Sequence, residues 1–332
     1  MAAAVAIFTG AVFTGCGSGD GGVICTGNEV SADNGPAAPK EAVTKLKLGD
    51  KEVPLYEYKG AEIPKIESSS DIPTLAVTRD AIYVLTNERS TSEFHLQKIS
   101  IADGAVTAVT DLGRVECEAI SSDGLNIYYI KERGDLAVCY DGTNASTFDL
   151  NAVDGCRNIC AIFGDQKAYI ADSFAQTRDT YCAAISKEGL KDVKSVLARE
   201  EIKKLSDGKN KADESAVFLC GADRDGFYLW CRDRAVLVMY GPDGKEVRSF
   251  AYSENGEKPR TGCSVLPTKD YIVYYEAGMM RVFQKKDGTR VGDIEMRLDS
   301  KQLLPACAAT DDANHIYFFD ERTGKNIYRV DL

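Results

Sequence analysis

The chain has 332 residues, with 51 Asp and Glu against 40 Lys and Arg, which gives a formal net charge of −11. This acidic balance disfavours nucleic acid and anionic membrane surfaces as partners. The length permits a sizeable core in one domain or two.

The N-terminal stretch, residues 1–16, is small or apolar and carries no charged side chain. It is shorter than the ~20 residues that a transmembrane helix needs, so residues 1–15 are predicted to be a signal peptide. Phe13-Thr14-Gly15-Cys16 resembles the cleavage box of bacterial lipoproteins, which implies that Cys16 is lipidated. No Lys or Arg precedes the apolar run, although signal peptides begin with such a basic stretch; a start codon assigned too late would explain its absence. The alternative to a lipidated Cys16 is a free cysteine beside an apolar N-terminus.

The next stretch, residues 16–42, is predicted to be a lipid-anchored flexible tether, because Gly, Ser, Asn, Asp and Pro dominate residues 17–40. The expected location is therefore extracytoplasmic. The protein would be anchored to a bacterial membrane only through the lipid on Cys16.

From Val43 onward the pattern is typical of β-strands. Residues 43–59 contain two strand-like runs around Gly49-Asp50, and Pro54 indicates an edge strand or a strand end. We expect part of this segment to be an outermost strand that pairs with residues 326–332.

A β-branched and aromatic run that contains a tyrosine recurs along the rest of the chain. The tyrosines are Tyr83, Tyr128, Tyr169, Tyr228, Tyr274 and Tyr317. A period of about 40 to 60 residues with four short strands per unit is typical of β-propeller blades. The clearest unit is 216–252, in which Asp225-Gly226 is predicted to form a tight hairpin turn. Residues 43–332 are therefore predicted to be all-β, a six-bladed β-propeller of four-stranded antiparallel blades, closed by the N-terminal strand.

The unit between Tyr169 and Tyr228 is longer than the others. Residues 197–205 are rich in helix formers and place Leu197, Ile202 and Leu205 near one face, which predicts a short helix. In a propeller this link lies on the same face as the loops between second and third strands. The insertion is thus either part of a binding face or a cap on a blade edge.

The chain has 11 cysteines, and ten remain if Cys16 is lipidated, so an exported protein could form up to five disulfides. Those predicted in the innermost strands are favoured as small buried thiols: Cys117, Cys160, Cys220, Cys263 and Cys307. A two-residue turn at Asp225-Gly226 would place Cys220 directly opposite Cys231. Opposed strand residues lie ~5 Å apart, so this pair is a possible disulfide.

Catalytic side chains are scarce. His95 and His315 are the only histidines, both expected at the surface, and the sequence contains no established catalytic, phosphate-binding or metal-binding motif. We therefore predict no catalytic residue, no metal site and no cofactor.

The gluconolactonase-like propellers, which hold a divalent ion in the central channel with carboxylate and amide ligands, offer an alternative. The residues of these types in or near predicted inner strands are Glu116, Glu118, Asn158 and Glu214. Their spacing reproduces no recognised motif, so solvated strand ends are favoured, and a divalent cation such as calcium is the alternative cofactor.

The predicted loops between second and third strands share an arginine in most units. These candidate ligand-binding residues are Arg89, Arg133, Arg178, Arg232, Arg234 and Arg322. Arginine forks match carboxylate and phosphate geometry, so this rim is where an anionic or peptide ligand would be held. The competing interpretation is that these arginines pair with their own neighbours and only keep the loops soluble.

By its blade rhythm over residues 43–332, the chain resembles six-bladed β-propellers of the NHL and TolB-like kind. The resemblance implies the fold and a habit of binding on one face, but fold alone does not fix function. We expect a cell-envelope lipoprotein that binds a protein, a peptide or a small anionic ligand on its loop face, without an enzymatic role. The alternative is a gluconolactonase-like hydrolase or lyase with a channel-bound metal.

Overall fold

The structure is a computed structural model. It describes residues 35–60, 75–88, 93–115, 120–130, 136–140, 143–149, 159–164, 167–172, 178–186, 189–206, 217–253, 255, 257, 264–276, 278–303, 305–311, 313–320 and 326–332.

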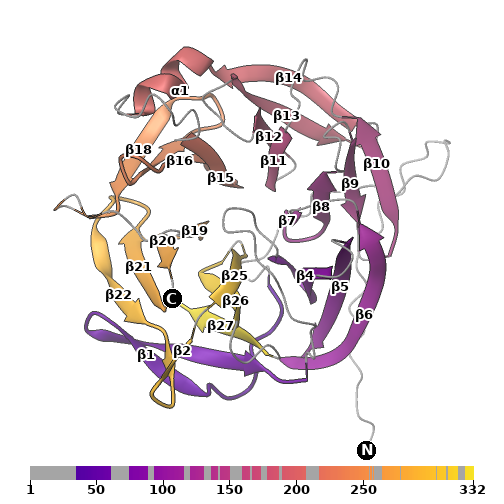
Figure 1. The fold of residues 1–332 in the computed structure, drawn as a ribbon, viewed down its shortest axis with the longest axis vertical. Helices are drawn as coiled ribbons and strands as arrows, with labels where there is room; N and C mark the ends of the chain where they lie inside the picture. Colours follow the sequence, from indigo (N-terminus) through magenta and orange to yellow (C-terminus); the bar gives the residue numbers. More distant parts are fainter. Residues whose placement is uncertain are drawn as a thin grey trace, which may run out of the picture.

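Antiparallel sheets stand in a closed ring around a central axis, as Figure 1 shows. Blade 1 contains β3 (Leu75–Thr78), β4 (Ala81–Glu88), β5 (Glu93–Ala102) and β6 (Ala105–Val115). Blade 2 contains β7 (Ile120–Ser122), β8 (Ile127–Ile130), β9 (Leu136–Tyr140) and β10 (Ala145–Asp149). Blade 3 contains β11 (Ile159–Gly164), β12 (Lys167–Asp172), β13 (Thr180–Ser186) and β14 (Gly189–Leu197).

The second half of the chain continues the same plan. Blade 4 contains β15 (Val217–Asp223), β16 (Gly226–Cys231), β17 (Val236–Tyr240) and β18 (Glu246–Ala251). Blade 5 contains β19 (Ser264–Pro267), β20 (Tyr271–Glu276), β21 (Met279–Gln284) and β22 (Arg290–Glu295). The closing sheet contains β25 (Pro305–Thr310), β26 (His315–Asp320), β27 (Ile327–Asp331), β2 (Lys51–Tyr58) and β1 (Thr44–Leu48). Outside the ring plan lie helix α1 (Arg199–Leu205) and the hairpin of β23 (Arg297–Leu298) and β24 (Lys301–Gln302).

The all-β propeller fold is confirmed, but the predicted number of four-stranded blades is wrong. Over the described residues there are five such blades, and the remaining sheet of the ring has five strands. The extra strand is β1, which stays on the ring because Leu46 and Leu48 are buried in one apolar cluster with Ile294 of blade 5. Figure 1 shows β1 beside β22.

Closure by the N-terminal strand is confirmed. β2 pairs antiparallel with β27, with Leu55 opposite Val330 and Tyr58 opposite Ile327. Pro54 lies just before this pairing, where its missing N–H breaks no bond to β27. The two ends of the propeller are thus joined in one sheet.

Residues 35–39, which belong to the predicted tether, lie against the propeller. Pro36 is buried, and its carbonyl accepts a 2.6 Å hydrogen bond from the guanidinium of Arg329. The hydroxyl of Tyr58 donates to the carbonyl of Ala37 at 2.9 Å. Residues 1–34, which include Cys16 and the predicted signal peptide, lie outside the described residues. In the part that is described, no helix has the length and apolar character to cross a membrane.

The six tyrosines of the sequence repeat are all buried in the second strands. Three of their hydroxyls donate to an Asp that ends the first strand or directly follows it: Tyr128 to Asp123 (2.6 Å), Tyr228 to Asp223 (2.7 Å) and Tyr317 to Asp311 (3.0 Å). Burial, reinforced by these carboxylates, raises the pKa of Tyr228 and Tyr317, so both phenols remain protonated donors. The repeat therefore combines a core side chain with an anchor for the adjoining turn.

The two faces of the ring differ in their connections. We call one face the turn face; it carries the turns from first to second strands at residues 79–80, 123–126, 224–225, 268–270 and 311–314. We call the opposite face the loop face; it carries the loops from second to third strands, such as 232–235, together with α1 and the β23–β24 hairpin.

Neighbouring blades bond to each other on the turn face. The N–H of Arg79 donates to the carbonyl of Gly124 at 3.0 Å, and the hydroxyl of Thr310 donates to the carbonyl of Pro267 at 2.8 Å. These bonds join blade 1 to blade 2 and blade 5 to the closing sheet at the turn face.

Candidate functional site

On the loop face, α1 spans the space between the loops of blades 3 and 4. At its start, the N–H of Arg199 donates to Asp179 Oδ1 at 2.8 Å. At its end, the hydroxyl of Ser206 donates to Asp233 Oδ2 at 2.7 Å, and Arg234 Nη1 donates to the carbonyl of Leu205 at 3.2 Å. The helix is therefore fixed by side chains from two different blades, although it has only 7 residues.

The predicted helix is confirmed, but it begins at Arg199 and leaves Leu197 in β14. Ile202 is fully buried, Leu197 is 8% exposed at the end of β14, and Leu205 packs against the same apolar cluster. The insertion therefore covers the edge of blades 3 and 4. We call α1, together with the loop residues that hold its two ends, the platform of the loop face.

The outer surface of α1 carries charges of both signs. Lys203 lies 3.3 Å from Glu200 and Lys204 lies 2.6 Å from Glu201, and all four side chains are solvated. The hydrogen bond from Lys203 lowers the pKa of Glu200. Exposed pairs of this kind contribute little to the stability of the helix. The helix thus presents a balanced polar surface.

Three of the six candidate arginines fall within the described residues. Arg178 is half-buried beside Asp179, which holds the start of α1. Arg232 is exposed, and its guanidinium lies 5.1 Å from the ring centroid of Phe218. Arg234 is exposed and bonds to α1 as described above. The structure thus brings the arginines of blades 3 and 4 to the two sides of one helix. The other three, Arg89, Arg133 and Arg322, lie outside the described residues.

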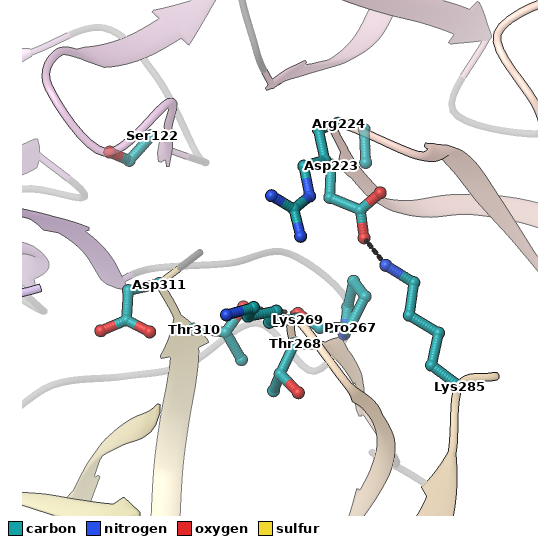
Figure 2. A pocket seen from close by; sticks show the side chains of 10 residues that line it. Ser122, Asp223, Arg224, Pro267, Thr268, Lys269, Lys285, Thr310 and Asp311 are labelled. Atoms are coloured by element: carbon teal, nitrogen blue, oxygen red, sulfur yellow. Dashed lines mark hydrogen bonds and ion pairs between the residues drawn. The ribbon is translucent and has the colours of Figure 1, made fainter. Parts of the chain in front are cut away.

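The turn face has a separate pocket at the mouth of the ring, of about 80 Å³, which Figure 2 shows. Its lining residues come from four sheets: Ser122, Ala222, Asp223, Arg224, Pro267, Thr268, Lys269, Lys285, Thr310 and Asp311. The pocket is small, and it has more cationic than anionic side chains.

Two of the pocket's charged groups form an ion pair between blades. The ammonium of Lys285, on blade 5, lies 2.7 Å from the carboxylates of both Asp223 and Asp225 on blade 4. The Lys285 side chain is only 8% exposed, so its charge is held by these two carboxylates and not by water.

His315 does not lie at the surface as predicted. Its side chain is 14% exposed, and Nδ1 lies 2.7 Å from Oδ2 of Asp311, whose side chain is fully buried. His95 is more accessible, at 32%, and lies 3.7 Å from Asp111. Each histidine thus has a carboxylate neighbour.

The described residues contain no group of three or more His, Cys, Asp or Glu side chains arranged to hold a metal ion. The alternative metal ligands proposed from the sequence are all outside the described ranges: Glu116, Glu118, Asn158 and Glu214. The channel-metal hypothesis is therefore neither supported nor contradicted by the ring as described.

The predicted Cys220–Cys231 disulfide is wrong. The residue opposite Cys231 is Val217, because the two-residue turn is Arg224-Asp225, and a bulge between Leu219 and Gly221 leaves Cys220 without an opposed residue. The two thiols pack into different apolar clusters, and Cys231 is a free buried thiol. Burial raises the pKa of Cys231 to about 12, which suits a small core side chain.

The interpretation of inner-strand cysteines as core residues is confirmed for Cys307, which is buried in β25. Cys220 is partly buried in β15 and packs against the cluster around Tyr228. The placements of Cys117 and Cys263, and of the side chain of Cys160, are not described.

Comparison with solved structures supports the class of protein that the sheets define, a β-propeller. A Bacteroides thetaiotaomicron protein of unknown function matches 85% of this chain and 78% of its own, at 12% identity and a TM-score of 0.51. A structure of the mitotic checkpoint complex matches 88% of this chain and 96% of its own, at 10% identity and a TM-score of 0.50. A weaker likeness, which adds no support for the fold, is to streptogramin B lyase: it covers 88% of this chain and 99% of that one, at 11% identity and a TM-score of 0.46.

Identities this low show the fold alone. No family model matches the sequence, and no curated protein matches it either. The β-propeller is therefore the level at which the protein is identified, and its function has to be argued from its own residues.

Proposed function

We propose that this protein is a non-enzymatic binding module of the bacterial cell envelope, which binds a protein or peptide partner on its loop face. The observation that carries this proposal is the attachment of α1 to the loops of two blades, through Asp179 at one end and Asp233 at the other. The propeller in this proposal follows the six-bladed plan of NHL and TolB-like proteins, with the closing sheet as the sixth blade.

The platform has the properties of a pre-organised binding surface. Its helix is fixed at both ends and its buried face is anchored by Ile202, so little ordering is required on binding. Arg232 is exposed while its stacking on Phe218 limits its orientations. Arginine is enriched in the contact regions of protein interfaces and pairs well with carboxylates, which favours an acidic segment as the partner.

We predict that replacing Arg178 and Arg232 together with Glu will weaken binding of the partner at least tenfold. The charge reversal repels an acidic segment, while the melting temperature should fall by only about 5 °C, because Arg178 is half-buried, Arg232 is exposed and neither belongs to the apolar core. The measurement is the affinity for the partner isolated with the wild-type chain, with thermal melting in parallel.

A charge-matched control separates local contact from net charge. Lys245 and Arg290 lie on the outer edge of blades 4 and 5 with side chains 85% and 50% exposed, and their replacement by Glu changes the net charge equally. This control should bind as the wild type does. Equal binding by both double variants would mean that the partner is held elsewhere.

The proposal places the propeller at the membrane through a lipid on Cys16. Support comes from the apolar residues 1–15 and the small residues before the cysteine. We predict that Cys16→Ser moves the protein from the membrane fraction to the soluble fraction on cell fractionation. A wild-type chain that is already soluble, with its N-terminus unprocessed, would contradict the anchor.

A further inference from the structure

The pocket on the turn face receives two cationic side chains from neighbouring blades. Arg224 lies in the turn between β15 and β16, and Lys269 lies in the turn between β19 and β20. Both residues are exposed, and Figure 2 shows the guanidinium of Arg224 and the ammonium of Lys269 directed into the same space.

The carboxylates beside this space are already occupied by other groups. Asp223 accepts from the hydroxyl of Tyr228 and from Lys285, both at 2.7 Å. Asp311 accepts from the hydroxyl of Tyr317 at 3.0 Å and from the N–H of Ala313 at 2.9 Å, and it also lies against His315. Neither carboxylate is bonded to the two exposed cations, although both keep their negative charge.

Arg224 and Lys269 themselves make no ion pair and no side-chain hydrogen bond with any residue that the structure describes. Both cations line the same pocket, and like charges in one pocket repel each other. An anion bound between them would remove this repulsion, which is the electrostatic reason to expect a ligand here.

The neutral hydroxyl groups of the pocket are already hydrogen-bonded within the protein, which restricts the chemical class of ligand that the pocket can bind. The hydroxyl of Ser122 donates to the carbonyl of Asn126 at 3.0 Å, and that of Thr310 donates to the carbonyl of Pro267 at 2.8 Å. The hydroxyl of Thr268 is engaged by Tyr271 and Asn314. The free donors are thus the guanidinium fork and the ammonium, which suit an oxyanion and not a neutral sugar or amide.

We propose that Arg224 and Lys269 form a binding site for an oxyanion group, a carboxylate or a phosphate, at the mouth of the ring on the turn face. The guanidinium matches two oxygens of the group, and the ammonium adds a point charge, so a dianion is preferred over a monoanion. A volume of about 80 Å³ accommodates the anionic group while the rest of a larger ligand extends into solvent. This site goes beyond the proposed function and lies on the opposite face, so neither depends on the other.

The test is isothermal titration of the full chain with inorganic phosphate and, separately, with succinate, at constant ionic strength set by sodium chloride. We expect saturable binding with Kd of about 1 mM or lower for at least one of them, and weaker binding of the monoanion acetate. Binding of phosphate alone assigns the site to a phosphate group, and binding of succinate alone assigns it to a carboxylate.

Substitutions test whether Arg224 and Lys269 bind the anion. Arg224→Gln combined with Lys269→Gln should weaken the titrated anion at least tenfold, and Arg224→Lys alone should weaken it less because the charge is kept. The matched control, Arg199→Gln combined with Lys245→Gln, removes the same charge from the loop face and the outer edge and should leave Kd unchanged. No saturable binding of either dianion, or equal Kd in the Arg224 and Lys269 double variant and the wild type, would overturn the proposal.

Discussion

Deletion of residues 41–59 is expected to unfold the whole ring in one cooperative transition. The segment contributes five apolar side chains that are almost completely buried: Leu46, Leu48, Val53, Leu55 and Tyr58. At about 2 kcal/mol for each buried side chain, their loss is on the order of 10 kcal/mol, as large as the whole free energy of unfolding of a typical domain. The deletion also leaves β27 as an unpaired edge and uncovers the apolar side of β22.

Circular dichroism during heating measures this effect. The truncated chain should show no cooperative transition, or one displaced downward by tens of degrees. A deletion of residues 17–34, in the predicted tether, is the control and should melt as the full chain does. If the chain without residues 41–59 melted at the full-length temperature, the joining of the two termini would not hold the ring together.

Lys285→Met is expected to destabilise the protein by about 3 kcal/mol, because it leaves the Asp223 carboxylate, 15% exposed, beside an apolar side chain. The change removes the ion pair between blades 4 and 5 but fills a similar volume, so loss of packing contributes little. Asp225 is 46% exposed and remains hydrated, so the cost arises at Asp223. Urea denaturation of the wild type and the variant measures the difference.

The double variant Lys285→Met with Asp223→Asn isolates the charge. The Asn side-chain oxygen can still accept from the hydroxyl of Tyr228, and no buried charge remains, so most of the lost stability should return. If the free energy of unfolding of the single variant lay within about 0.5 kcal/mol of the wild-type value, the ion pair would contribute no more than an exposed one does. A double variant as unstable as the single one would assign the loss to packing.

The blades were predictable from sequence because the tyrosine runs alternate with turn residues, and this local pattern sets both the strand and its buried face. The hairpin of blade 4 shows where such reasoning stops. Gly226 has φ of +149° and begins β16 instead of sitting in the turn, and a Cβ at this position would collide with the carbonyl of Tyr240. That requirement comes from a third strand, so the turn was misplaced by one residue. The bulge near Cys220 shifted the pairing further.

The candidate sites were predictable only in part. Helix formers and one apolar face revealed α1, and the loop positions of Arg178 and Arg232 followed from the repeat. The bonds of α1 to Asp179 and Asp233 join segments far apart in the chain, and no local pattern encodes them. The pocket on the turn face was missed for the same reason: its two cations belong to turns of different blades, and each alone looks like an ordinary exposed residue.

The central claim, that a partner is bound on the loop face around α1, is tested most directly by site-specific photo-cross-linking in cells that natively produce the protein. A cross-linking amino acid is placed at Arg178 or Glu200 on the loop face, and at Asp270 on the turn face, all positions at the surface or half-buried. The account predicts the same discrete adduct from Arg178 and Glu200 and none from Asp270. An adduct from Asp270 alone, or no adduct from either loop-face position, would contradict it.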